Sequence, residues 1–272
     1  MNVDHVIVTD EKTTLYNCLG WTLRLKQWVW PWPKDKPVNK VQFDALYKKY
    51  GYRPIARGGV AVLGNNTADM LHGVLGIRGL VSTPLWESKC GDGIRIRHDL
   101  DEMQPGFYGT RQGFYSNQQA LTEMPDEDMG HEPSELAAFD QTETLHLKAA
   151  PAEQEQVTTR AAAVDAALRA RFDRAYAAWK ATWSAPEVSF SSNPGDRAKS
   201  PEFREVVALG PDCLPLIMEK LACQGDFFAL QAADELLRAE HRVTFELEDE
   251  RVLGGEQLRA QETVRRWLNA GG

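Results

Sequence analysis

The residue types best suited to covalent chemistry begin with Asn17 and Cys18, close to the start of the chain. The apolar run after them predicts a helix over residues 17–28, so the thiol would lie in its first turn. A helix N-terminus lowers the pKa of a thiol from its free value of about 8.5, because the dipole and the free N–H groups favour the thiolate. We expect Asn17 either to cap that turn or to point its amide at a developing oxyanion. Many free cysteines are simply small buried apolar side chains, so Cys18 alone does not establish a nucleophile.

A histidine that could serve as the base follows on a second apolar run, residues 71–77, which predicts a strand. Placed next to Cys18, His72 would take the thiol proton and later protonate the leaving group. The alternative is a histidine that only packs beneath the sheet. Cys18 and His72 are therefore a candidate catalytic pair.

A third group must accept a hydrogen bond from the other ring nitrogen of the base and fix its tautomer. Glu87 and Ser88 are candidates on the predicted strand 85–89, and strand alternation lets only one of them face inward. His98, on the predicted strand 94–100, is a second candidate to orient the base. Its alternative role is structural, tying the last strand to the preceding turn.

The composition is that of a globular protein with an acidic balance. The net charge is -8 and the sequence pI is near 5.4, which argues against nucleic acid as the main partner. No apolar run is long enough to span a bilayer, and no signal peptide is visible. These features predict a cytoplasmic protein without membrane partners, with export by a signal-less route as the alternative. The cysteines form no Cys-x-x-Cys pair, so we expect no zinc site, no disulfide framework and no cofactor.

Three regions follow from the distribution of apolar and charged residues. Residues 1–115 combine helical patterns over 17–28 and 41–50 with consecutive short strand patterns that include 4–8 and 59–63, which predicts an α+β domain with an antiparallel sheet. Residues 116–152 are predicted to be an acidic linker, because the stretch 112–147 carries eight acids and no lysine or arginine. Residues 153–272 show helical periodicity, with an apolar stripe over 164–183, a polar break over 186–200, proline starts and glycine stops, which predicts an all-α, HEAT-like domain.

The N-terminal region resembles a family of small bacterial domains in the NlpC/P60 and papain-like superfamily of cysteine hydrolases. The resemblance covers about residues 11–115 and rests on five ordered motifs: Tyr16-Asn17-Cys18, His72-Gly73-Val74, Ser88-Lys89-Cys90-Gly91, His98 and Tyr108-Gly109. Leu19 and Cys90 depart from the usual residues of these motifs. The resemblance implies a papain-like fold with Cys18 as nucleophile and His72 as base, and it weakly favours Ser88 as the third group.

These observations predict a cysteine hydrolase that acts on an amide bond, as a peptidase, amidase or deamidase. An acyl or peptidyl transferase would use the same covalent intermediate. We expect a protein or peptide substrate, a bacterial toxin or effector as one biological setting, and a protein partner bound through the helical region. The alternative is a non-catalytic protein-binding module that uses the tryptophan- and proline-rich loop, residues 28–33, together with the helical domain.

Overall fold

The computed structural model of the chain describes residues 7–55, 59–66, 69–77, 85–98, 108–116, 139 and 148–271. These residues have an α+β architecture, with an antiparallel sheet and helices in the first part and helices in the C-terminal part, as the sequence predicts. The chain divides into two compact units, one holding Met1–Thr144 with Phe190–Ser192 and the other Leu145–Ser189 with Asn193–Gly272. Within the described ranges, no helix combines the length and apolar character needed to cross a bilayer.

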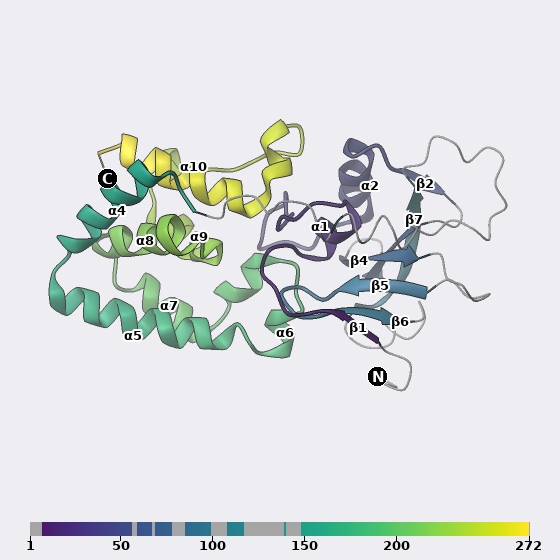
Figure 1. Ribbon diagram of the computed structural model, residues 1–272, viewed down its shortest axis with the longest axis horizontal. Helices are drawn as coiled ribbons and strands as arrows, with labels where there is room; N and C mark the ends of the chain where they lie inside the picture. The colour runs from purple at the N-terminus through teal and green to yellow at the C-terminus, as the bar shows by residue number, and fades with distance from the viewer. Residues whose placement is uncertain are drawn as a thin grey trace. The chain divides into compact units, whose positions relative to one another are not determined.

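The first unit is built on a seven-stranded antiparallel sheet with the order β1-β6-β5-β4-β3-β7-β2. Figure 1 shows its strands beside helices α1 and α2. The elements are β1 (Ile7–Asp10), α1 (Cys18–Thr22), α2 (Lys40–Lys49), β2 (Arg53–Ile55), β3 (Val60–Asn66), β4 (Asp69–Ile77), β5 (Leu85–Lys89), β6 (Arg95–His98) and β7 (Thr110–Ser116).

Most of the predicted elements of this unit are confirmed, as α2, β3, β4, β5 and β6. Strand β1 overlaps the end of the predicted strand 4–8, of which residues 4–6 lie outside the described residues. The last two residues of the predicted strand 94–100 also lie outside them. Strands β2 and β7 were not predicted, because β2 has only three residues, β7 lacks a regular apolar alternation, and both pair with strands distant in sequence. Residues 117–138 and 140–147, which hold most of the predicted acidic linker, lie outside the described residues as well.

One face of strand β4 lies against helices α1 and α2. A Cβ atom added to Gly73 would lie 2.8 Å from Tyr47 Oη in α2 and 3.2 Å from Thr22 Oγ1 in α1. The ring of Tyr47 also stacks on Tyr115 of β7, with 4.4 Å between centroids. Glycine at position 73 therefore lets both helices approach the sheet closely.

The first helix is much shorter than the sequence predicts. A helix was predicted over residues 17–28, but α1 ends at Thr22 and Arg24 adopts a left-handed conformation with φ of 62°. The chain then folds back over the helix, and Leu25 N donates to Gly20 O over 2.8 Å. Gln27 O lies so close to Gly20 that an added Cβ would meet it at 2.2 Å. The apolar residues after Thr22 are buried by this reversal rather than by a longer helix.

The tryptophan- and proline-rich loop packs inward. Trp28, Trp30 and Trp32 are all buried, as expected for tryptophans over a core edge. Trp30 and Trp32 meet edge to face, and Trp32 stacks on Phe43 of α2 at 5.0 Å between centroids. These rings therefore belong to the core of the first unit.

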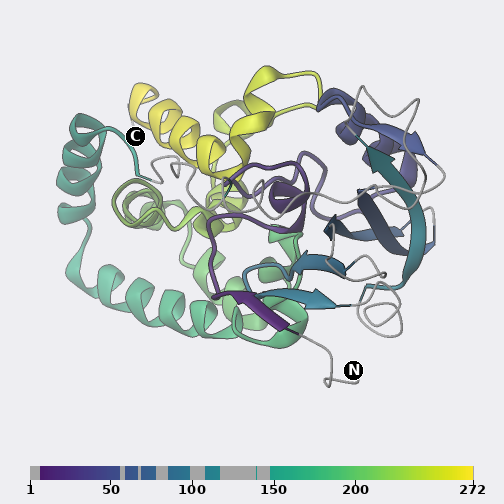
Figure 2. The same ribbon diagram turned by 45° about the vertical axis from the view of Figure 1, so that its right-hand side comes forward.

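The second unit is helical, and Figure 2 shows its helices from the teal α4 to the yellow α10. Buried aromatic side chains along and beside α5, including Phe172, Trp179 and Trp183, confirm the predicted apolar stripe. The predicted polar break over residues 186–200 is wrong in part, because two prolines begin short helices there. The elements are α4 (Pro151–Ala162), α5 (Ala166–Thr182), α6 (Pro186–Ser189), η2 (Pro194–Ala198), α7 (Pro201–Val207), η3 (Pro211–Cys213), α8 (Leu214–Gln224), η4 (Phe227–Ala229), α9 (Leu230–Leu236), η5 (Ala239–His241), η6 (Glu250–Gly254) and α10 (Gly255–Asn269).

The close approach at Gly73 predicts a local difference in stability between two strand glycines. Gly73→Ala should lower the free energy of unfolding by about 1–3 kcal/mol, because the added methyl group meets Tyr47 and Thr22 in a packed core. Gly113→Ala is the matched control, since its nearest neighbour is the flexible end of Lys40. Urea unfolding of both variants measures the difference, and equal midpoints would contradict the packing described for β4.

Candidate active site

Cys18 is the first residue of α1 and is fully buried. Its Sγ lies 2.9 Å from the Oγ of Ser192, a residue of the first unit that is distant in sequence. Backbone N–H groups of Gly73 and Leu19 also donate toward the sulfur. The sulfur thus faces a hydroxyl group and two amide donors at a helix start, as the sequence led us to expect for the helix.

The surroundings of the Cys18 thiol shift its pKa in opposite directions. Burial raises the pKa of Cys18 above its usual value. The hydrogen bond with Ser192, the amide of Gly73, the positive charge of Lys89 and the amide of Leu19 each lower it, in that order of size. Burial outweighs these favourable groups, so Cys18 is a neutral thiol at physiological pH in this conformation.

Asn17 performs the capping role predicted for it and makes three further hydrogen bonds. Its Oδ1 accepts from Gly20 N over 2.9 Å, which caps α1, and from Val29 N over 3.2 Å. Its Nδ2 donates to Val29 O over 2.7 Å and to Ser192 O over 3.4 Å. The amide is fully buried. Asn17 therefore connects the helix start, the tryptophan-rich loop and the carbonyl of Ser192.

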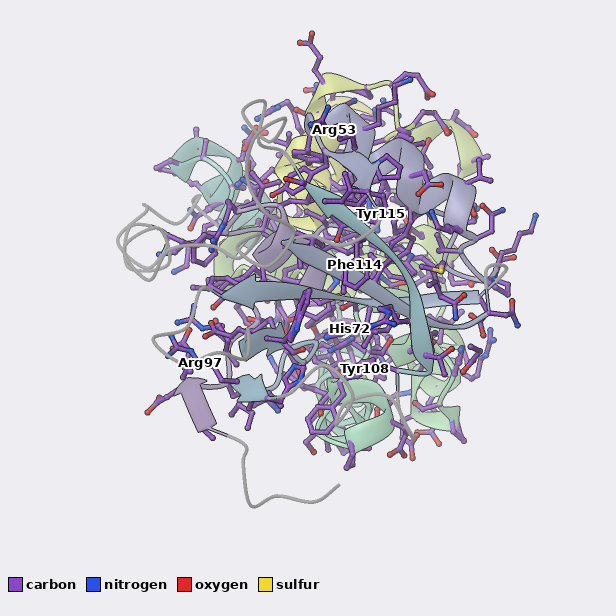
Figure 3. The ribbon with its side chains drawn as sticks, turned by 90° about the vertical axis from the view of Figure 1, so that its right-hand side faces the viewer. Arg53, His72, Arg97, Tyr108, Phe114 and Tyr115 are labelled. Carbon is purple, nitrogen blue, oxygen red and sulfur yellow. The ribbon has the colours of Figure 1, made fainter. Side chains whose placement is uncertain are left out.

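His72 lies on β4, but it faces away from α1. Its neighbour Gly73 faces α1 and α2, and successive strand residues point to opposite faces. The imidazole stacks on Tyr108 with 3.8 Å between centroids, and both residues are labelled in Figure 3. Neither ring nitrogen has a hydrogen-bond partner within the described part of the chain. Burial, aided by the charges of His98 and Lys89, lowers the pKa of His72 to about 3.

Ser88 and His98 form a hydrogen-bonded pair. Their Oγ and Nε2 atoms are 2.7 Å apart, and both side chains are buried. Strand register puts them on the same face as His72, because Trp86 pairs with His98 and also with Gly76 of β4. Ser88 is thus hydrogen-bonded to His98. Within the described residues, neither of them forms a hydrogen bond with a ring nitrogen of His72.

Glu87 points to the other face and forms ion pairs with two arginines of β6. Its carboxylate oxygens lie 2.9 Å from Arg95 Nε and 2.8 Å from Arg97 Nε. A carboxylate held by two guanidinium groups is a structural anchor of β5 to β6. The alternation expected for Glu87 and Ser88 is confirmed, and Glu87 lies on the face opposite His72.

Lys89 brings a buried positive charge near the thiol. Its Nζ donates to the carbonyl oxygens of Gly91, Gly93 and Thr13 over 2.7, 2.6 and 3.1 Å. Burial lowers the pKa of Lys89 to about 8. The three carbonyls fix the ammonium group in place, and its charge acts on both Cys18 and His72.

Two residues next to the thiol were not identified from the sequence. Trp28 Nε1 donates to Ser192 O over 2.9 Å, and Ser192 itself contacts Cys18. Trp28 was recognised only as part of the tryptophan- and proline-rich loop, and Ser192 lies in a polar stretch without periodicity. The one signal near it is Phe190, an aromatic residue inside that polar stretch. Among the described side chains, no three histidine, cysteine, aspartate or glutamate residues gather as a metal site would require.

Comparison with known proteins adds one finding. Residues 7–116 match a protein family described as a Domain of unknown function (DUF7689). The matched range begins with β1 and ends with β7, so it includes Asn17, Cys18, His72 and the described sheet, but not Ser192. No curated protein and no solved structure matches the chain.

The buried, neutral imidazole of His72 predicts a loss of stability in acid. Its pKa is about 3 in the folded protein and about 6.5 when unfolded, so between these values the unfolded chain binds the extra proton. Stability should therefore fall as the pH decreases from about 7.5 to about 5, by about 2 kcal/mol from this residue. His72→Phe keeps a ring beside Tyr108 but cannot titrate. Its free energy of unfolding should therefore fall by about 2 kcal/mol less than that of the wild type over that range.

Urea unfolding at the two pH values measures this difference. His241→Phe, in the helical unit, is the control for removal of a histidine elsewhere in the chain. Equal losses for the wild type and His72→Phe would show that the folded protein accepts a proton on His72.

Proposed function

We propose that Cys18 is the nucleophile of a cysteine hydrolase that acts on an amide bond. The observation that carries the proposal is a pair of side-chain donors to the carbonyl group of Ser192, the residue whose hydroxyl contacts the thiol. Ser192 O accepts hydrogen bonds from Trp28 Nε1 and Asn17 Nδ2, while Ser192 Oγ contacts Cys18 Sγ. Preorganised donors of this kind stabilise the charge that develops on a carbonyl oxygen during acyl transfer.

The reaction would proceed through a thioester. The Cys18 thiolate attacks the carbonyl carbon of the substrate, and the electron pair moves to the oxygen held by Trp28 and Asn17. The C–N bond then breaks and the amine leaves with a proton from the base, after which water hydrolyses the thioester and restores the thiol. The amides of Gly73 and Leu19 and the charge of Lys89 favour the thiolate once the sulfur is exposed to water.

His72 is the proposed base. It directly precedes Gly73, whose amide donates toward the sulfur, and its nitrogens have no competing partner in the described residues. Because its ring faces away from α1, the proposal requires the imidazole to leave its stack on Tyr108 and turn toward Cys18. Hydration during this step would also raise the pKa of His72 from about 3 toward the free value of about 6.5.

The hydrogen bond between Ser88 and His98 supports a positioning role for that pair on the face of His72. In this proposal, Ser88 holds the ring of His98 in place, and the electrostatic interaction with His98 contributes to the lowered pKa of His72 while both are buried. A third group would accept a hydrogen bond from the other ring nitrogen of His72 only after that ring turns toward Cys18. A papain-like arrangement, with the nucleophile at a helix start against an antiparallel sheet, is consistent with α1 and β4.

A non-catalytic binding module is the second candidate, and the burial of the neutral thiol favours it. The tryptophan-rich loop offers this alternative little support, because Trp28, Trp30 and Trp32 are buried. A binding role would then fall to the HEAT-like helical part of the chain. The two candidates differ in whether amide hydrolysis depends on Cys18.

Hydrolysis of fluorogenic peptide amides tests the proposal. The assay uses the wild type and Phe190→Ala, which removes a ring that packs in the first unit two residues before Ser192. Cys18→Ser should reduce the rate in either background by about 10³-fold or more, and His72→Phe by about 10²–10⁴-fold. Cys90→Ser is the matched control, since Cys90 is a second buried thiol, with a pKa raised by burial to about 11.

The proposal would be overturned if no amide is hydrolysed faster than in the matching Cys18→Ser protein. It would also be overturned if Cys90→Ser abolished a hydrolysis that Cys18→Ser preserved. A loss of rate in His98→Phe but not in His72→Phe would transfer the role of base to His98.

A further inference from the structure

Phe190–Ser192 is bound within the first unit, although the residues before and after it belong to the second. Three side chains donate to its main-chain carbonyl groups. Tyr108 Oη donates to Phe190 O over 3.0 Å, while Trp28 and Asn17 donate to Ser192 O over 2.9 and 3.4 Å. The segment is therefore held at two carbonyl groups, two residues apart.

These donors all come from other parts of the chain and are all buried. Hydrogen bonds to main-chain carbonyl groups are a common way to bind a peptide segment, because every residue supplies that acceptor. Side-chain pockets then provide selectivity. The donors in this site thus have the chemistry of a peptide-binding site.

The side chains of the segment also fit this site. The ring of Phe190 packs against the cluster that contains Trp86 and Tyr108, and it lies so near Gly93 that an added Cβ would meet it at 3.0 Å. The hydroxyl of Ser192 reaches the sulfur of Cys18. The site therefore accommodates an aromatic residue and, two residues later, a small hydroxyl residue.

We infer that the Cys18 site binds peptide segments with an aromatic residue two positions before a small residue, and that Phe190–Ser192 is an internal ligand that occupies this site. The inference rests on the proposed function, because the carbonyl of Ser192 lies where the carbonyl of a substrate would be held. It adds the substrate class and a mode of regulation. The segment covers the thiol, and its departure would expose Cys18 and the donors of Trp28 and Asn17.

The test uses the full chain carrying Phe190→Ala and Ser192→Gly together, with alkylation by iodoacetamide at each cysteine followed by mass spectrometry. Cys18 should react about tenfold faster than in the wild type, because the segment loses its ring and its contact with the thiol. The hexapeptide acetyl-Val-Ser-Phe-Ser-Ser-Asn-amide, added in excess, should slow this reaction. The matched peptide with alanine for phenylalanine and glycine for the second of the adjacent serines should not.

Glu187→Gln is the matched substitution on an exposed residue close to the segment, and it should leave the reaction of Cys18 unchanged. Cys213, buried in the helical unit, reports unfolding if its alkylation also accelerates. If the double variant unfolds, Trp28→Phe provides the same test by removing one carbonyl donor, and Cys18 should again react faster while Cys213 does not.

Faster alkylation without protection by the hexapeptide would overturn the inference, as would an unchanged rate at Cys18 in a folded variant. Neither measurement requires turnover, so the result is separate from the hydrolase proposal. If the peptide slows alkylation but no amide is hydrolysed, the inference of a peptide site stands and the proposed hydrolase activity is wrong. If amides are hydrolysed but the peptide does not slow alkylation, the hydrolase proposal stands and the inference of a peptide site is wrong.

Discussion

The buried amide of Asn17 is the interaction on which the rest of the site depends. One side chain accepts from Gly20 N and Val29 N and donates to Val29 O and Ser192 O. An amide is the only side-chain group of this size that offers an acceptor and two donors in fixed geometry without charge. It caps the start of α1, holds the loop after the reversed chain and binds the carbonyl of Ser192, whose hydroxyl contacts Cys18. A leucine of similar volume would leave those buried backbone groups unpaired, at a cost of about 1–3 kcal/mol for each.

Strand alternation is the second constraint, and it determines which groups reach the sulfur. Gly73 presents its amide to Cys18 and an empty Cβ position to both helices, so its neighbour His72 must face the opposite side. The same rule separates Glu87, bound by two arginines, from Ser88, bonded to His98. This conformation therefore holds a neutral thiol and a neutral imidazole on different faces. Under the proposed function, the departure of Ser192 and the turning of His72 convert it to an active state.

The sequence was most informative where structure is set by local periodicity and capping. The buried strands β3, β4 and β5 and the capped helix α2 follow from apolar runs and from Asn39 with Gln42. The length of α1 could not be predicted, because the reversal depends on a left-handed Arg24 and on backbone packing over Gly20. Strand β7 and the contact of Ser192 with Cys18 depend on pairing between distant residues, for which a single sequence carries no periodic signal. Among the candidate residues, the cap at Asn17 and the helix start at Cys18 were predictable, whereas the carbonyl donor Trp28 was not.

The reactivity of Cys18 in Asn17→Asp tests the central claim most directly. Aspartate keeps the oxygen that caps α1 but lacks the N–H donors to Val29 O and Ser192 O. Asn39→Asp is the matched control. The side-chain oxygen of Asn39 caps α2, and the hydrogen bonds described for this side chain include none from its amide nitrogen. Alkylation of Cys18 should accelerate in Asn17→Asp while Cys213 in the same molecule keeps its wild-type rate, and Asn39→Asp should change neither. Identical rates at Cys18 in Asn17→Asp, Asn39→Asp and the wild type would contradict the claim that this amide holds Ser192 against the thiol.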